Sequence, residues 1–221
     1  MTFGAYTTRS RKYRICIKPA PLSVLALLFS LGPVRSPAQQ PRAGRLPVLT
    51  RAEQVRSLAP EQAKLGYPVR LHAVVTYYNG QTPDLFVQDS SAGIWVESAN
   101  SIQPVRAGDL IELEGITAPG EFAPVVDKPR VKILRRVSLP EPKQVSIERL
   151  QTGDYDSQWV ELEGVIRSAP IVRIGGGPVV RFEIASADGR FLAIVPGPDV
   201  KASRLVDAKV KLRGACGSIF N

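Results

Sequence analysis

Hydrophobic and polar residues alternate along most of the chain after residue 67. In VRLHAVV (69–75) and IELEG (111–115) every second side chain is apolar, which is typical of a β-strand with one buried face. Glycine, proline, asparagine and aspartate, which favour turns, separate short runs of this kind. The pattern predicts about five strands between residues 67 and 140.

The same alternation returns after a break that contains two prolines. VELEGVI (160–166) aligns with the first of the two runs above, and VKLRG (210–214) aligns with the second. Apolar positions match in both pairs, and Gly164 stands over Ala73. A barrel strand that coils sharply favours a residue without a Cβ where another backbone comes close. We therefore predict two similar β units in one chain.

Each predicted unit has the size of a five-stranded OB-fold barrel. The expected fold class is all-β, with two small OB-like five-stranded barrels in tandem and short capping helices; a β-sandwich is the alternative. The second barrel is expected to be incomplete, because the chain stops at ACGSIFN, where another strand or two would close it. The expected organisation is a signal peptide (1–38), a linker with a short helical cap (39–66), a first barrel (67–140), a linker with a short helix (141–157) and a second, truncated barrel (158–221).

Residues 1–38 have the three parts of an export signal. Basic residues precede the apolar run LSVLALLFSLGPV (22–34), and small residues at Ser36 and Ala38 suit a signal peptidase. The run is shorter than the ~20 apolar residues that a spanning helix needs. We predict cleavage after Ala38 and a periplasmic or extracellular location, with no membrane span after the leader; an uncleaved anchor is the alternative.

Composition adds little once the leader is set aside. The net charge of +9 is mostly the leader's, since six of the 29 basic residues and no acid lie in residues 1–38, which leaves 23 basic against 20 acidic residues. A mildly basic body argues against a nucleic-acid partner, because affinity for phosphates comes from clustered cations. The stretch KPRVKILRR (128–136) is the best local basic patch.

No pattern of catalytic residues is found. His72 is the only histidine, and it lies beside Arg70 on the polar face of a predicted strand, as a solvated surface residue would. Cys216 is the only cysteine after the leader, so one His and one Cys give too few ligands for zinc. No calcium-binding loop is present either. The chain is therefore expected to hold no metal or cofactor and not to be an enzyme by itself.

Aromatic residues supply the candidate binding site. Trp95 lies between Ile94 and Val96, so if those two fill the core, the indole is exposed and marks a contact surface. Packing against the helical cap or the other barrel is the alternative. Glu121 and Phe122 follow a Pro-Gly turn on a predicted loop, and OB folds bind ligands across one barrel face and its loops. With these residues we group Tyr77 as a predicted ligand-binding set.

Four stretches together resemble a known family. LTRAEQVRSLAPEQAKLGYPVRLHAVVTYY, LFVQDSSAGIWVE, AGDLIELEGITAPGEFAPVV and DSQWVELEGVIRS are similar to the tandem OB-like extracytoplasmic region of bacterial membrane sensor histidine kinases. The resemblance covers residue 49 to the C-terminus. It implies a truncated product or a fragment of a longer receptor, whose kinase would lie elsewhere.

The resemblance and the residues point to the same function. We expect a non-catalytic extracytoplasmic binding or sensor module, whose partner is a small ligand or a protein, with a homodimer contact as a further expectation. An exported OB-fold binder of nucleic acid or oligosaccharide is the alternative. A hydrolase with a carboxylate pair is a weaker third candidate, since no spacing singles out two acids.

Overall fold

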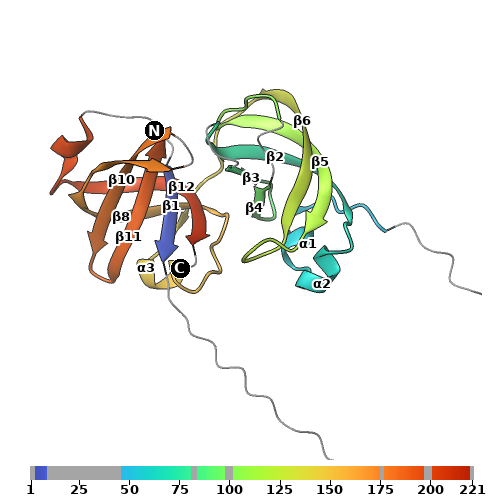
Figure 1. The fold of residues 1–221 in the computed structure, drawn as a ribbon, viewed down its shortest axis with the longest axis horizontal. Helices are drawn as coiled ribbons and strands as arrows, with labels where there is room; N and C mark the ends of the chain where they lie inside the picture. Colours follow the sequence, from blue (N-terminus) through green and yellow to red (C-terminus); the bar gives the residue numbers. More distant parts are fainter. Residues whose placement is uncertain are drawn as a thin grey trace, which may run out of the picture.

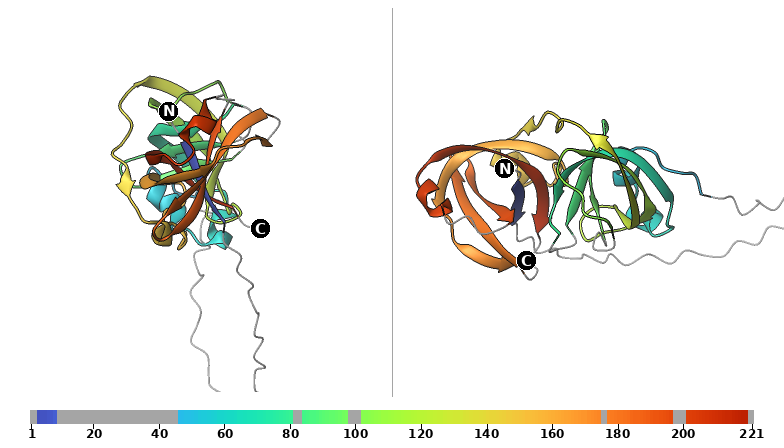
Figure 2. Two further views of the ribbon diagram at one scale, coloured as in Figure 1. Left: turned by 90° about the vertical axis from the view of Figure 1, so that its left-hand side faces the viewer. Right: turned by 90° about the horizontal axis from the view of Figure 1, so that it is seen from above.

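The chain is mostly β and forms two sheets with short helices (Figure 1). The structure is a computed structural model. It describes residues 46–80, 84–97, 102–174, 177–196 and 201–219, together with the backbone of residues 3–8. The two sheets lie side by side as separate units when the molecule is seen from above (Figure 2).

The first unit is a ring of five strands preceded by two short helices. Its pairings close in the order β2-β3-β4-β6-β5, with β4 and β6 parallel and the other neighbours antiparallel. Apolar side chains from alternate positions of β2, β4 and β5 fill the inside of the ring. The elements are α1 (Ala52–Arg56), α2 (Pro60–Ala63), β2 (Pro68–Tyr78), β3 (Leu85–Gln88), β4 (Gly93–Val96), β5 (Asp109–Ala118) and β6 (Val125–Arg136).

The second unit has the strand order β7-β8-β12-β1-β11-β10-β9, with an additional pairing between β8 and β10. Its core gathers around Val160, Ile166 and Ile184, each of them at most 1% exposed. The elements are β7 (Lys143–Gln144), α3 (Ile147–Leu150), β8 (Trp159–Ser168), β9 (Ile171–Ile174), β10 (Gly177–Ser186), β11 (Gly189–Pro196), η2 (Ala202–Leu205), β12 (Lys209–Ile219) and, from the other end of the chain, β1 (Phe3–Thr8).

Four strands have the same neighbours in both units. β8 pairs with β12 and β10 as β2 pairs with β5 and β3, and β10 pairs with β11 as β3 pairs with β4. The segments that align in the sequence therefore lie in corresponding strands. Three strands have no counterpart in the sequence-based prediction: the two-residue β7 in the predicted linker, β9, and β1, which lies within the predicted leader.

The helix before each unit is held to the same turn by the same kind of bond. Asp89, in the turn between β3 and β4, accepts a hydrogen bond from the amide of Ala52 at 2.8 Å. Asp188, in the turn between β10 and β11, accepts one from the amide of Ile147, also at 2.8 Å. Each amide begins a helix and lacks a partner within it, so the carboxylate both caps the helix and docks it on the sheet.

Stability should fall in acid partly because of Asp89. Burial by itself would raise the pKa of this carboxyl, but hydrogen bonds from Ser91 and from the amides of Ala52 and Ala92 outweigh it and hold the pKa below its ordinary 3.8. The unfolded chain therefore binds the proton more tightly. The carboxylate's contribution is present above about pH 4 and is lost as the pH falls through the folded-state pKa.

We expect Asp89→Asn to lower the free energy of unfolding by about 1–2 kcal/mol at pH 7. The difference from wild type should shrink as the pH falls below about 4. Urea unfolding across that range measures it, with the exposed Asp154→Asn as control. A difference that is independent of pH would contradict the role of the charge.

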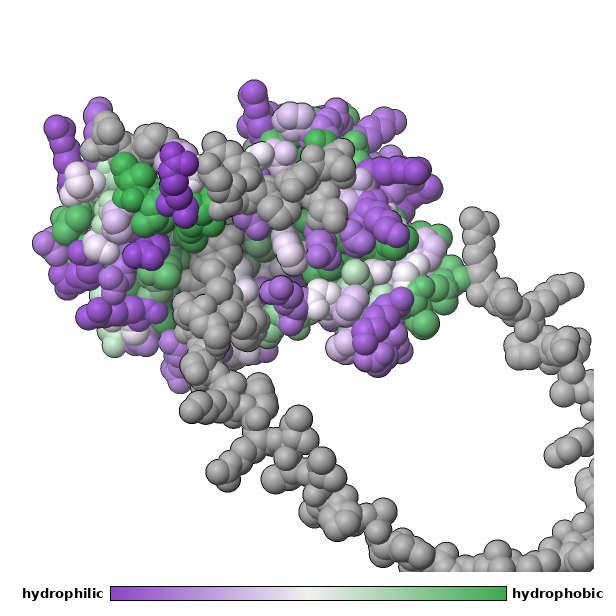
Figure 3. Space-filling model, viewed as in Figure 1, coloured by the Kyte–Doolittle hydropathy of each residue, from purple (hydrophilic) through white to green (hydrophobic). Residues whose placement is uncertain are grey.

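Hydrophilic residues cover much of the described surface in Figure 3. The exposed large apolar side chains include Phe122 between β5 and β6, Ile133 and Leu134 on β6, and Ile171 and Ile174 on β9. Among the described residues, the structure contains no helix with the length and apolar character needed to cross a membrane.

Candidate functional site

A pocket of about 160 Å³ lies where the two units meet. Three of the four residues predicted for ligand binding, Trp95, Glu121 and Phe122, are in its wall. The first unit contributes Asp84, Phe86, Trp95, Glu121, Phe122, Ala123, Pro124 and Val125, and the second unit contributes Asp156, Ser157, Gly217 and Ser218.

Trp95 faces the junction because of the alternation in β4. Its neighbours Ile94 and Val96 are fully buried in the first core, so the indole points the other way. The indole is half-buried, because the second unit partly covers it and Ala215 joins Phe86 in the cluster against which it packs. This matches the alternative of packing against the other unit. The indole nitrogen is buried and has no hydrogen-bond partner in the part of the chain that the structure describes. Buried donors of this kind normally have an acceptor, and this one belongs to a side chain that lines the pocket.

Phe122 and Glu121 come from the loop between β5 and β6. Phe122 is 44% exposed, and its ring reaches Gly153 of the second unit, where an added Cβ would lie 2.5 Å from the ring Cζ. Glu121 next to it is exposed and carries a charge at the pocket mouth. The predicted loop therefore does form one wall, but only the contact with the second unit gives that wall its position.

Tyr77 lies beneath the pocket instead of in its wall. The ring is 3% exposed and packs edge-on against Phe86, with the ring centroids 6.0 Å apart. Burial, reinforced by the negative charge of Asp84, raises the pKa of Tyr77 above the ordinary range. The phenol therefore stays protonated, and it supports the aromatic wall without lining the pocket.

Asp156 links three parts of the junction. Its Oδ2 lies 3.5 Å from Nη1 of Arg56 in α1 and accepts a hydrogen bond from the Ser157 hydroxyl at 2.9 Å. Its Oδ1 accepts from the amide of Ser218 in β12 at 3.1 Å. The side chains of Arg56 and Asp156 are only 17% and 12% exposed. The ion pair is therefore shielded from water and stronger than a surface pair.

Hydrogen bonds between side chains and backbone also join the two units. Gln88 accepts a hydrogen bond from the amide of Trp159 at 2.8 Å, and Gln158 donates one to the carbonyl of Gly93 at 3.3 Å. A Cβ added at Gly93 would lie 2.0 Å from the carbonyl oxygen of Ser157. Only glycine permits this approach, so the pocket is built on a close-packed junction.

The groups with catalytic potential lie apart from one another. The side chain of His72 is 66% exposed on β2, with its Nε2 3.9 Å from a carboxylate oxygen of Glu112, so the prediction of a solvated surface histidine is confirmed. Cys216 is buried, and burial together with the charge of Asp156 raises its pKa to about 12, which keeps the thiol protonated. Among the described residues, no group of three His, Cys, Asp or Glu side chains could hold a metal.

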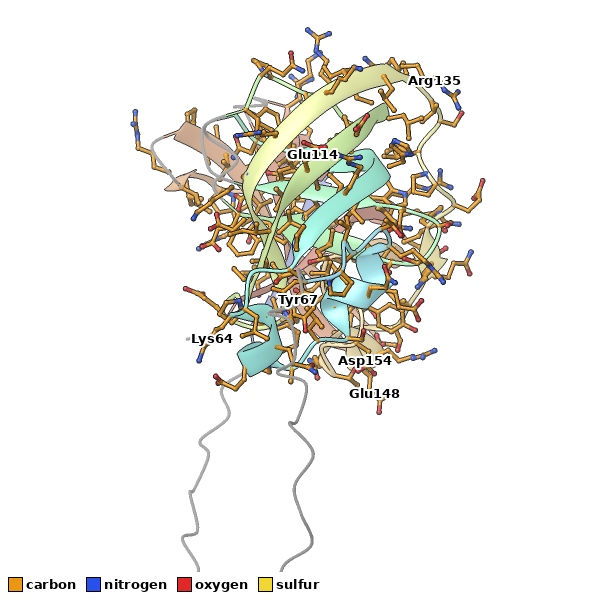
Figure 4. All side chains as sticks on the ribbon, turned by 90° about the vertical axis from the view of Figure 1, so that its right-hand side faces the viewer. Lys64, Tyr67, Glu114, Arg135, Glu148 and Asp154 are labelled. Atoms are coloured by element: carbon orange, nitrogen blue, oxygen red, sulfur yellow. The ribbon has the colours of Figure 1, made fainter. Side chains whose placement is uncertain are left out.

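The basic stretch 128–136 forms much of β6, and most of its side chains are exposed. Arg135 lies at the end of β6 away from α1 and α2 (Figure 4). Arg136 at the same end has its guanidinium 3.9 Å from Asp109. None of these residues lines the junction pocket.

The second-unit half of the pocket was missed in the sequence. Asp156 and Ser157 lie in a loop, and Gly217 and Ser218 lie late in β12, with no motif around them. Gly93 and Gly153 are the residues that could have pointed to this half of the pocket, since each is a glycine where another chain segment comes close.

Comparison with protein-family models and with curated proteins finds no match for this chain.

Proposed function

We propose that this protein is a non-catalytic, exported binding or sensor module that holds a small ligand in the junction pocket. The observation that carries the proposal is the Trp95 side chain, which lines a pocket and whose buried indole N–H has no partner among the described residues. A buried donor without an acceptor costs about 1–3 kcal/mol, which a bound acceptor would recover.

The pocket wall suggests the kind of ligand. Phe86, Trp95 and Phe122 offer aromatic surface, and Glu121 places a carboxylate beside it, whereas the Asp156 carboxylate is already paired with Arg56. Aromatic rings next to a carboxylate favour a small molecule with an apolar or cationic part, and the indole N–H favours an acceptor elsewhere on it. A cavity of about 150 Å³ holds a molecule the size of benzene, so the ligand should be of that order.

The topology supports an OB-like assignment. The ring β2-β3-β4-β6-β5 has five strands and one parallel pair, and four strands of the second unit have matching neighbours. We propose that both units are OB-like, which agrees with the resemblance to the input region of sensor histidine kinases. A ligand at the junction contacts both units, so its binding would favour one arrangement of the units over others. That is what an input region requires.

Binding is tested by tryptophan fluorescence, because the chain has only two tryptophans. In a Trp159→Phe background Trp95 is the only indole, and a ligand in the pocket should change its emission. Small amines, amino acids, sugars, peptidoglycan fragments and single-stranded DNA are the ligands to screen. We expect a small-molecule ligand whose affinity falls much less with added salt than that of a phosphate-bound nucleic acid.

Trp95→Phe, measured by calorimetry in the otherwise wild-type chain, should weaken that binding about 5- to 20-fold, as loss of one hydrogen bond does. The matched control is Arg135→Ala with Arg136→Ala, which should leave binding unchanged. DNA binding that collapses as salt rises, and that depends on the two arginines and not on Trp95, would favour the nucleic-acid alternative instead. The intact mass of the exported protein should be that of a chain that begins at Gln39.

A further inference from the structure

β1 lies between β11 and β12 in the second sheet, although it comes from the other end of the chain (Figure 1). It runs parallel to β12 from Phe3 opposite Gly214 to Thr8 opposite Ile219. On its other side it runs antiparallel to β11, with Ala5 opposite Ala193. The ring β8-β12-β1-β11-β10 therefore depends on β1 for its closure.

The first unit shows what normally fills this place. β6 lies between β4 and β5, the counterparts of β11 and β12, and it runs parallel to β4 and antiparallel to β5. β1 takes the corresponding place in the second unit with the opposite direction. The space between β11 and β12 therefore accepts a strand that does not follow β12 along the chain. The direction of that strand is opposite to the direction of β6 in the first unit.

An empty gap here would be costly. β11 and β12 would each present an unpaired row of N–H and C=O groups, and such edges recruit other strands. Ala193 and Cys216 beside the gap are each about 1% exposed and belong to the second core, so water would also reach apolar side chains. Strand addition relieves both costs, because backbone hydrogen bonds supply affinity with little demand on sequence.

We propose that the gap between β11 and β12 is a strand-acceptor slot and that residues 3–8 are its occupant. The slot lies next to the ligand pocket, since Gly217 and Ser218 of β12 line the pocket and also pair with β1. It is closed while the chain retains residues 3–8. Cleavage after Ala38 removes them and opens the slot to strand addition. Export would then convert a self-completed sheet into one that can bind an extended peptide segment.

The slot is tested in the full chain through Cys216, which lies opposite Ala5. In a Cys16→Ser background Cys216 is the only thiol, and its rate of reaction with a thiol reagent reports opening of the sheet. Ala5→Pro removes a backbone donor from the middle of β1, whereas Ala5→Ser keeps it. We expect Ala5→Pro to raise the reaction rate about tenfold, as loss of one or two ladder hydrogen bonds would, and Ala5→Ser to leave it near wild type.

Adding the free peptide FGAYTT to the Ala5→Pro protein should restore the slow rate, and the same peptide with proline at its third position should not. Amide hydrogen exchange should rise in β11 and β12 and stay unchanged in β4 and β6 of the first unit. An unchanged Cys216 rate in Ala5→Pro, a fast rate that FGAYTT does not reverse, or exchange that rises equally in both units would each overturn the proposal. Trp95 fluorescence, which reports the ligand pocket, distinguishes these outcomes from a failure of the proposed function.

Discussion

Gly164→Val is expected to lower the free energy of unfolding by about 3 kcal/mol, near the upper end of what overpacking costs. A Cβ at Gly164 would lie 2.5 Å from Cγ2 of Ile184 and 2.8 Å from the carbonyl oxygen of Ala185. Ile184 is fully buried, and Ala185 belongs to β10, which pairs with β8 at this point. Neither neighbour can move without disturbing the core or the pairing, so the β-branched side chain forces the two strands apart.

Urea unfolding measures this effect, and Gly80→Val is the matched control. The nearest atom to a Cβ at Gly80 belongs to the Tyr78 side chain, at an ordinary contact distance of 3.5 Å. The control should change stability by less than about 1 kcal/mol. Equal stability of the Gly164 variant and the wild type would show that β8 and β10 do not approach one another in this way.

Asp156→Ala is expected to lower the free energy of unfolding by about 1–3 kcal/mol, because it leaves polar groups at the junction without their partner. Arg56 would lose its only ion pair among the described residues, and the amide of Ser218 would lose its acceptor. The junction should loosen more than either core. Hydrogen exchange at Ser218 and urea unfolding together measure the local and the global effect.

Asp154→Ala is the matched control, since it removes the same charge from the same loop. Asp154 is exposed and is labelled in Figure 4. A double-mutant cycle with Arg56→Gln isolates the ion pair, whose coupling should exceed that of a surface pair, about 0.5 kcal/mol. If Asp156→Ala and Asp154→Ala had equal effects, the contacts of Asp156 would contribute nothing to the junction.

The candidate site divides into a half that could be predicted and a half that could not. Trp95 could be predicted because the alternation of apolar residues in β4 is a local pattern. Burial of Ile94 and Val96 turns the indole outward from the first core. Phe122 was found because a Pro-Gly turn places it on a loop. The loop around Asp156 carries no comparable local pattern, since its place in the site depends on packing between residues far apart in the chain.

The sequence by itself determined the mostly β character, the repeated strands and the glycines at close approaches, because these follow from side-chain periodicity and from the space around a missing Cβ. Tertiary structure alone decided which loops meet, that Tyr77 supports the pocket from beneath, and that residues 3–8 pair with β11 and β12. Strand pairing uses backbone N–H and C=O groups that every residue except proline carries in full. A segment from the other end of the chain can therefore complete a sheet without any signal in its side chains.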